Sequence, residues 1–238
     1  MIKRGVFKLK TINPNPAENR ELLERILPFW NKLTEAQQET LAENTTFAKY
    51  GKKENIISDT CIGTGAIYVK SGMIRAYLLS EEGREVTLYR MSKGDFCVLS
   101  SACATDDMPF DIFFDAEVES EIYIIGSKSF TRVRAENVYA DNFTLRVAMT
   151  RFAEVVWALE QILFMSFDKR LAIFLIDDLA HRGGDTVYMT HDQIAKHMGS
   201  AREVVTRMLK YFVDEGLVKI SRGGVTVIDK DRLRRLTY

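Results

Sequence analysis

Five polar residues near the C-terminus of the chain are spaced to share one side of a helix. Arg202, Thr206 and Lys210 are four residues apart, and Glu203 and Arg207 are also four apart. Residues three or four apart lie on the same helix face. In the major groove of duplex DNA, arginine donates two hydrogen bonds to guanine O6 and N7, and glutamate accepts one from cytosine N4. The spacing therefore favours base readout, in which each good contact discriminates by roughly 1–3 kcal/mol.

Two short helices must position this face. Thr190 with Gln193, and Ser200 with Glu203, each have the form of a capping box at the start of a helix. Met198-Gly199 lies between them as the turn, because glycine tolerates the positive φ of a tight helix-helix connection. We expect the Ser200 hydroxyl and the free amides of the following turn to bind a DNA phosphate. The pair has the features of a helix-turn-helix.

A hairpin with a basic tip is predicted directly after the helices. Gly216 ends the second helix, and Leu217–Ile220 and Val225–Ile228 have the residue types of short strands. The turn between them, Ser221 to Gly224, carries Arg222. A solvated helix with ordinary surface ion pairs is the alternative, and it leaves this wing unexplained. The sequence therefore predicts a winged helix-turn-helix that binds double-stranded DNA.

The charge distribution permits DNA binding. The chain of 238 residues has 33 basic and 33 acidic side chains, hence no net charge. Eight acids and one lysine lie between Lys93 and Glu121, whereas the stretch from Ser200 to Arg222 is rich in lysine and arginine. A DNA-binding protein needs a local basic face, not a basic total.

The sequence indicates a cytoplasmic protein without membrane contact. No apolar run approaches the roughly 20 residues of a membrane helix, and the first residues lack the apolar core of a signal peptide. The three cysteines, Cys61, Cys97 and Cys103, are too few and odd in number for a disulfide framework.

The first half of the chain predicts two helices followed by many short strands. Helices are expected at Glu18–Leu27, before Pro28, and at Thr34–Asn44, with Thr34 as N-cap. From about residue 45, β-rich runs alternate with glycine-containing turns. The clearest runs are a hairpin, Ile74–Leu79 with Glu85–Tyr89, and the later strands Asp111–Phe114 and Glu121–Ile125. This pattern favours a small barrel or jelly roll.

A long helix is predicted from about Ala135 to Met165, a stretch without proline or glycine. Its apolar residues recur at heptad spacing, which is typical of a dimer seam, and Asn142 occupies a seam position where a polar residue can fix register. The seam comprises Val138, Asn142, Leu145, Met149, Phe152, Val156, Leu159 and Leu163. The alternative is a helix packed only on its own domain. A second apolar stripe favours one face on the barrel and one on a partner subunit.

The order of these parts resembles the Crp/Fnr family of bacterial transcription regulators. The motifs are IYVKSGMIRAYLLSEEGREVTLYRMSKGDF in the barrel and GSAREVVTRMLKYFVDEGLVKISRGGVTVID at the C-terminus. The resemblance implies homodimers on palindromic DNA, with recognition helices roughly 34 Å apart. It also places Arg202, Glu203 and Arg207 at the base-contacting positions.

The resemblance implies an α+β fold with a cupin-like β-roll sensor domain, a long dimerisation helix and a C-terminal winged helix-turn-helix. The expected boundaries are an N-terminal arm at 1–17, a cyclic-nucleotide-binding-like sensor at 18–133, the dimerisation helix at 134–167 and the DNA-binding domain at 168–238.

The sensor departs from well-known family members. Cyclic-AMP binders carry Gly-Glu-Leu after the Gly-Asp-Phe turn and a later arginine that holds the phosphate. Here Gly94-Asp95-Phe96 is followed by Cys97, and the later strand has Asp111 and no arginine. Residues 1–60 contain no cysteine, unlike the members that hold an iron–sulfur cluster. No cofactor is therefore predicted, and both cyclic AMP and an iron–sulfur cluster are disfavoured.

The effector remains unidentified. Candidate residues for an effector pocket or a redox site are Phe96, Cys97, Cys103, Asp111, Phe113 and Trp157. The two cysteines can sense thiol redox state or can be buried as small hydrophobic residues. The aromatic residues suit a small apolar ligand or plain core packing. Two thiolates do not complete a tetrahedral zinc site, so no metal is predicted.

The predicted function is a sequence-specific regulator that binds a palindromic operator as a homodimer, under a small-molecule or redox signal, with RNA polymerase as a further partner. A constitutive regulator with a purely structural barrel is the alternative. A cupin-type metal-dependent enzyme is a remote one, because residues 45–130 contain no histidine. We therefore expect no catalytic residues and no enzyme activity.

Overall fold

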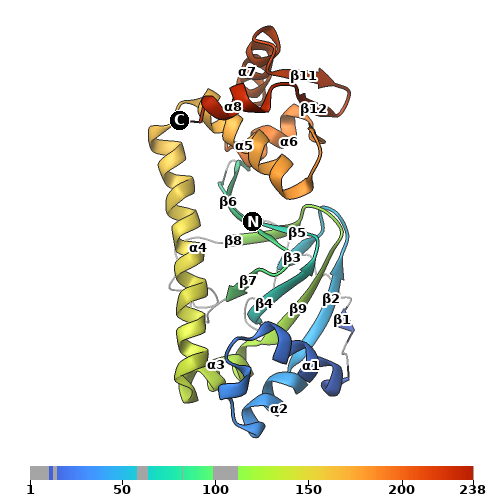
Figure 1. Cartoon of the computed structure of the whole chain (residues 1–238), viewed down its shortest axis with the longest axis vertical. Helices are drawn as coiled ribbons and strands as arrows, with labels where there is room; N and C mark the ends of the chain where they lie inside the picture. The colour runs from blue at the N-terminus through green and yellow to red at the C-terminus, as the bar shows by residue number, and fades with distance from the viewer. Residues whose placement is uncertain (1–10, 13–14, 58–63, 82, 99–111, 238) are drawn as a thin grey trace. The chain divides into compact units, whose positions relative to one another are not determined.

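The computed structural model describes residues 11–12, 15–57, 64–81, 83–98 and 112–237 (Figure 1). The chain forms two compact units. The first consists of Met1–Tyr77 and Leu88–Glu154, and the second of Leu78–Thr87 and Val155–Tyr238. None of the helices in the described ranges is both long and apolar enough to span a membrane.

The first unit begins with α1 (Pro16–Ile26), a short 3₁₀ helix η1 (Trp30–Lys32) and α2 (Glu35–Glu43). Both predicted helices are confirmed, and Thr34 forms the reciprocal capping box with Gln37. The buried amide of Asn19 on α1 donates to the carbonyl oxygens of Ala42 and Thr45, at 2.9 and 2.8 Å. It thereby joins the first helix to the start of the β-structure.

Two sheets follow, as expected for a β-roll. One has the order β1 (Thr11–Ile12), β2 (Thr45–Tyr50), β9 (Ser120–Gly126), β4 (Thr64–Ser71) and β7 (Phe96–Val98). The other has the order β3 (Asn55–Ile57), β8 (Ile112–Ala116), β5 (Met73–Leu79) and β6 (Glu85–Ser92). Fully buried apolar residues from both sheets, among them Ile67, Ile74 and Ile122, form a shared core.

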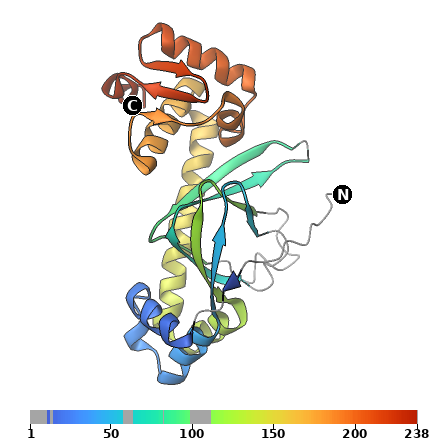
Figure 2. The ribbon, with the colours of Figure 1, turned by 90° about the vertical axis from the view of Figure 1, so that its right-hand side faces the viewer.

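The helix predicted from Ala135 is wrong at its start. The structure has α3 (Ser127–Glu136), then a break, then α4 (Val138–Phe164), which continues without interruption (Figure 2). The break lies at Asn137, whose backbone is extended and whose side-chain oxygen accepts from the amides of Tyr139 and Ala140. Its side-chain amide donates to the carbonyl oxygen of Lys32 at 2.8 Å. Asn137 thus caps the start of α4 and holds it against Lys32.

Arg151 attaches α4 to the β-roll. Its Nε donates to the carbonyl oxygen of Phe96 at 3.2 Å, and its guanidinium lies 3.4 Å from the carboxylate of Asp95. Phe143, two turns earlier, packs against the rings of Phe29 and Phe96. One face of α4 therefore belongs to the core of the first unit.

The second unit contains the C-terminal elements. They are α5 (Phe167–Arg182), β10 (Thr186–Val187), α6 (His191–His197), α7 (Arg202–Asp214), β11 (Val218–Ser221), β12 (Gly224–Val227) and α8 (Lys230–Arg235). Both predicted wing strands are confirmed to within one residue, whereas β10 and α8 are additional elements.

The end of the β5–β6 hairpin also lies in the second unit. Val86 forms an isolated antiparallel bridge with Met198. The hydroxyl of Thr87 is 3.2 Å from Nδ1 of His197, and Nζ of Lys196 is 3.4 Å from a carboxylate oxygen of Glu85. The hairpin end therefore packs against the end of α6 and the turn that follows it.

Candidate nucleic-acid interface

The first helix of the candidate interface, α6, starts at the predicted cap. The hydroxyl of Thr190 accepts from the amide of Gln193 at 3.2 Å, and the Gln193 side chain accepts from the amide of Thr190 at 2.9 Å. Gly199 in the turn has φ +60°, the left-handed conformation that glycine adopts without strain. The sequence pattern correctly located this helix start and turn.

The second capping box, Ser200 with Glu203, is wrong. Ala201 is the N-cap of α7, and no side chain caps the helix. The amide of Ser200 donates to the carbonyl oxygen of Ala195 at 2.9 Å and so closes the preceding turn. Ser200 therefore belongs to the turn, and the amides at the start of α7 have no side-chain cap.

The two faces of α7 differ as its sequence predicts. Val205, Leu209 and Phe212 are fully buried in the core of the second unit. The predicted DNA-binding side chains on this helix are exposed: Arg202, Glu203, Thr206, Arg207 and Lys210. Exposure leaves their donors and acceptors available to the edges of bases.

The wing lies on a three-stranded sheet of order β10-β12-β11. Ser221 is opposite Gly224, so Arg222 and Gly223 form the tip of the hairpin. A hollow of about 500 Å³ separates the start of α6, the start of α7 and this tip. It is lined by Met189, Thr190, His191, Asp192, Arg202, Ser221, Gly223 and Gly224.

His191 lies in this hollow and contacts α7. Its Nδ1 is 2.9 Å from the hydroxyl oxygen of Thr206. Burial, and then the positive charge of Arg202, lower the pKa of His191 below its usual value. Sequence analysis did not single out this contact, because nothing local pairs residues fifteen positions apart on different helices.

The sensor candidates are only partly described. Cys61, Cys103 and Asp111 lie outside the described residues. Cys97 is buried, and its Sγ lies 3.7 Å from the hydroxyl oxygen of Tyr89.

The aromatic candidates lie in different surroundings. Phe96 packs against Tyr68 and Phe143, and Phe113 stacks on Tyr77. Trp157 on α4 is exposed. Phe96 and Phe113 therefore belong to aromatic contacts of the β-roll, and Trp157 does not.

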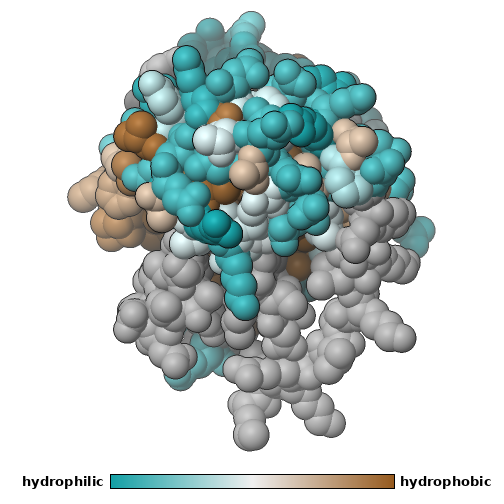
Figure 3. Space-filling model, turned by 90° about the horizontal axis from the view of Figure 1, so that it is seen from below, coloured by the Kyte–Doolittle hydropathy of each residue, from teal (hydrophilic) through white to brown (hydrophobic). Residues whose placement is uncertain are grey.

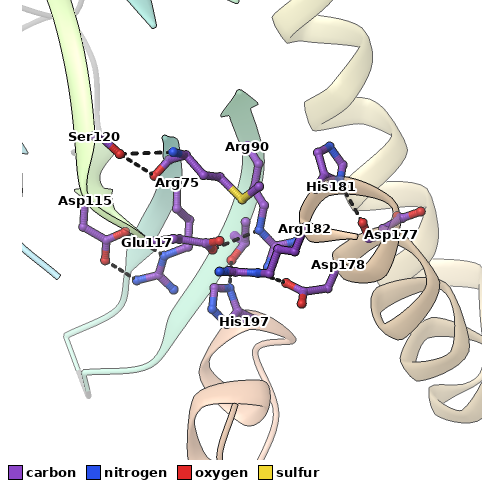
Figure 4. A network of polar contacts seen from close by, with 12 residues as sticks. Arg75, Arg90, Asp115, Glu117, Ser120, Asp177, Asp178, His181, Arg182 and His197 are labelled. Atoms are coloured by element: carbon purple, nitrogen blue, oxygen red, sulfur yellow. Dashed lines mark hydrogen bonds and ion pairs between the residues drawn. The ribbon is translucent and has the colours of Figure 1, made fainter. Parts of the chain in front are cut away.

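Two ion pairs lie on the β-roll sheet. The guanidinium of Arg75 contacts Asp115, and that of Arg90 contacts Glu117, with closest distances of 2.7 and 2.9 Å (Figure 4). All four side chains are at most 19% exposed. Each arginine on this part of the sheet thus already has a carboxylate partner. Among the described residues, no group of three or more histidine, cysteine or acidic side chains is arranged to hold a metal ion.

The predicted seam on α4 is exposed to solvent. Asn142 is exposed, and the apolar seam residues are between 44% and 65% exposed: Val138, Leu145, Met149, Phe152, Val156, Leu159 and Leu163. Viewed from below, the surface over α1 and α2 is largely hydrophilic, and hydrophobic side chains gather at the left margin (Figure 3). An apolar stripe of this length is unusual for a monomer surface.

A β-roll joined by a long helix to a winged helix-turn-helix defines a class of DNA-binding transcription regulators. Residues 47–137 match the model of the cyclic nucleotide-binding domain, and residues 169–236 match the Crp-like helix-turn-helix domain. The chain belongs to the Crp/Fnr family, because it is 38% identical to a solved protein described as a Crp/Fnr-family transcriptional regulator from Eubacterium rectale. That similarity covers 90% of this chain and 99% of the other, with a TM-score of 0.82.

Curated relatives are more distant. The cAMP-activated global transcriptional regulator CRP of Salmonella typhimurium is 24% identical over 189 residues, covering 76% of this chain and 87% of that protein. The Cyclic AMP receptor protein of Thermus thermophilus is 23% identical, covering 74% and 81%. The α+β fold and the predicted family are thereby confirmed, and the chain is a DNA-binding transcription regulator with a cyclic-nucleotide-binding-like domain.

Proposed function

We propose that this regulator binds a palindromic operator as a homodimer and that a signal sensed in the β-roll controls its affinity for DNA. The observation that carries the proposal is the exposed polar face of α7, combined with the exposed apolar seam of α4. The first supplies base contacts. The second supplies the two-fold partner that a palindrome requires.

The seam supports a parallel pair of helices. Its residues follow the heptad spacing of a coiled coil, in which each apolar side chain packs between residues of the partner helix. The exposed Asn142 would lie opposite its counterpart and fix the register of the pair. Dimerisation would bury these apolar side chains. Burial stabilises the dimer by roughly 25 cal/mol for each Å² of apolar surface removed from water.

We also propose that the effector is not a cyclic nucleotide, although the names of the curated relatives refer to cyclic AMP. A cyclic phosphate needs positive charge or clustered donors. Arg75 and Arg90 are already paired with Asp115 and Glu117. A redox signal at Cys97 and Cys103 is one candidate, and a small apolar ligand is another. A constitutive regulator with a structural barrel is the alternative.

The further partners follow from the family. Its members regulate transcription, which supports RNA polymerase as a partner, a cytoplasmic location and a role without enzymatic activity. Signal transmission would be a shift in population between a DNA-competent and an incompetent dimer.

The experiment is the selection of bound sequences from a random duplex pool, with and without a reducing agent. A palindromic winner supports the homodimer, and a difference between the two conditions supports the redox signal. The same winner in both conditions, at equal affinity, favours constitutive binding. The proposed dimer is contradicted if the enriched sequence is not palindromic and light scattering shows that the bound protein is a monomer.

A further inference from the structure

We propose that His191 sets the direction of the hydrogen bond made by the Thr206 hydroxyl, and thereby which bases this position of α7 accepts. His191 is a positioning residue in this scheme, and Thr206 makes the base contact. The role presupposes the proposed function of α7 as the helix that contacts bases.

The geometry joins two helices through one contact. His191 is the first residue of α6, and Thr206 lies one turn after Arg202 on the exposed face of α7. The ring nitrogen and the hydroxyl oxygen are 2.9 Å apart, a normal hydrogen-bond distance. Thr206 therefore lies exposed on the face of α7 that is proposed to contact DNA. Its hydroxyl is also hydrogen-bonded to a titratable group, the His191 imidazole.

The chemistry of the pair has two states. A threonine hydroxyl has a single hydrogen. When the neutral imidazole carries its proton on Nε2, Nδ1 accepts that hydrogen, and the hydroxyl oxygen can only accept from a base. When the ring is protonated, Nδ1 donates to the oxygen, and the hydroxyl hydrogen is free to be donated to a base.

The two states select different bases. In the major groove, cytosine presents only an amino donor, guanine and thymine present only acceptors, and adenine presents both. The neutral ring therefore favours cytosine opposite Thr206. The protonated ring favours guanine or thymine, and adenine is compatible with both states.

The surroundings of His191 favour the neutral ring in the free protein. Burial and the nearby Arg202 on α7 lower its pKa. Asp192 on α6 also lines the hollow, and the wing contributes only Ser221, Gly223 and Gly224, which do not titrate. Negative charge from a bound DNA backbone favours the protonated ring. Acidification of the complex therefore changes the state of the pair.

The test is selection from a random duplex pool at about pH 8 and about pH 5, with the lower value set well below the usual histidine pKa of about 6.5 because the surroundings of His191 lower its pKa. The full-length protein should enrich a site in which one position per half-site changes from cytosine to guanine or thymine. A single hydrogen bond predicts a change of about two- to tenfold in relative base preference.

Three variants isolate the pair. His191→Phe keeps an aromatic ring without hydrogen bonding, and Thr206→Val keeps the side-chain shape without the hydroxyl. Both should remove the dependence of base preference on pH. Thr206→Ser retains the hydroxyl and should retain the dependence.

His181→Phe is the matched control. His181 on α5 contacts the carbonyl oxygen of Asp177 and not the recognition helix, so its loss should leave the pH-dependent preference intact. An enriched site with the same bases at both pH values overturns the role of His191 and leaves the proposed function standing. The same holds if His191→Phe and Thr206→Val both keep the change. A failure to enrich any duplex at either pH contradicts the proposed function as well.

Discussion

The guanidinium group of Arg75 on β5 donates two hydrogen bonds to the carboxylate of Asp115 on β8, from Nη2 to Oδ2 at 2.7 Å and from Nε to Oδ1 at 3.1 Å. The Arg75 side chain is 6% exposed and the Asp115 side chain 19%. The aromatic ring of Tyr77 lies 4.2 Å from the same guanidinium. A buried cation in this position depends on its partner, because desolvation of an unpaired charge is expensive.

Asp115→Asn should therefore destabilise the protein strongly. The change removes the negative charge that pairs with the buried guanidinium of Arg75, and loss of one partner of a buried ion pair costs about 3–5 kcal/mol. Urea denaturation followed by circular dichroism measures the loss. Glu136→Gln is the control, because Glu136 pairs with Arg132 on the exposed surface of α3, so this change should leave stability nearly unchanged. Equal losses for the two variants would contradict the importance of the buried pair.

Gly199→Ala should destabilise the turn before the recognition helix. The residue has φ +60°, and an added Cβ would lie 2.7 Å from Cγ2 of Val86. The left-handed conformation costs roughly 1–2 kcal/mol for alanine, and overpacking adds about 1–3 kcal/mol. Gly223→Ala has φ +88° but open space around its Cβ, so it should show only the first cost. Thermal unfolding measures both, and Val86→Ala should recover part of the loss in Gly199→Ala only.

Arg207→Ala should weaken binding to the selected operator by roughly 1–3 kcal/mol and relax base preference at one position per half-site. The reason is the loss of a bidentate donor to guanine. Fluorescence anisotropy with the selected duplex and single-base variants measures both effects. Arg132→Ala on the exposed surface of α3 removes the same charge from the first unit and should leave affinity unchanged. An operator affinity unaltered by Arg207→Ala would remove this residue from the interface.

Phe152→Glu should convert the proposed dimer to a monomer. Phe152 is 60% exposed in the middle of the seam, where a buried carboxylate would face its counterpart across the two-fold axis. Analytical ultracentrifugation measures the mass. Arg146→Glu places the same side chain on an exposed position of α4 outside the seam and should leave the mass unchanged. A dimer that persists in Phe152→Glu would assign the dimer interface elsewhere.

The protein should lose stability at alkaline pH because of Tyr50, and Tyr50→Phe should remove that loss. The Tyr50 hydroxyl is buried without a hydrogen-bond partner among the described residues. Burial, and then Glu54, raise the pKa of Tyr50 from 10.0 to about 12. Between these values the unfolded chain releases a proton that the folded chain retains, so stability falls with rising pH, by up to about 1.4 kcal/mol per pH unit.

Urea denaturation between pH 9 and pH 12, at values of about one unit apart, measures this slope. The exposed Tyr188 supplies the control, since Tyr188→Phe should preserve the alkaline loss. A slope that Tyr50→Phe leaves unaltered would show that this hydroxyl is ionised equally in both states.

Local patterns predicted the elements whose causes are local. Thr34 and Thr190 each form a capping box with the glutamine three positions later, and both helices start where the sequence places them. Ser200 with Glu203 shows the limit of the same pattern. The amide of Ser200 donates to the carbonyl oxygen of Ala195, five positions earlier, which places Ser200 in the turn and leaves Ala201 as the N-cap of α7.

Features that depend on distant partners were beyond the sequence. Asn137 interrupts the predicted helix while its side chain bonds to Lys32, more than a hundred positions away. The contact between His191 and Thr206 depends on how α6 and α7 cross. Helix α8 could have been predicted from the sequence. The Asp229 side chain accepts from the amide of Arg232, which is a local capping pattern.

Strand β10 has a mechanical consequence. Its two residues pair with Thr226 and Val225 of β12, immediately before the cap of α6. The segment that leads into the first helix is thereby hydrogen-bonded to the wing, so the wing cannot swing independently of the helix pair. The DNA contacts proposed for the tip and for α7 would then occur at a constant separation along the duplex. An operator with one base pair inserted between those two contact zones would lose one set of contacts, because the protein could not stretch to follow it.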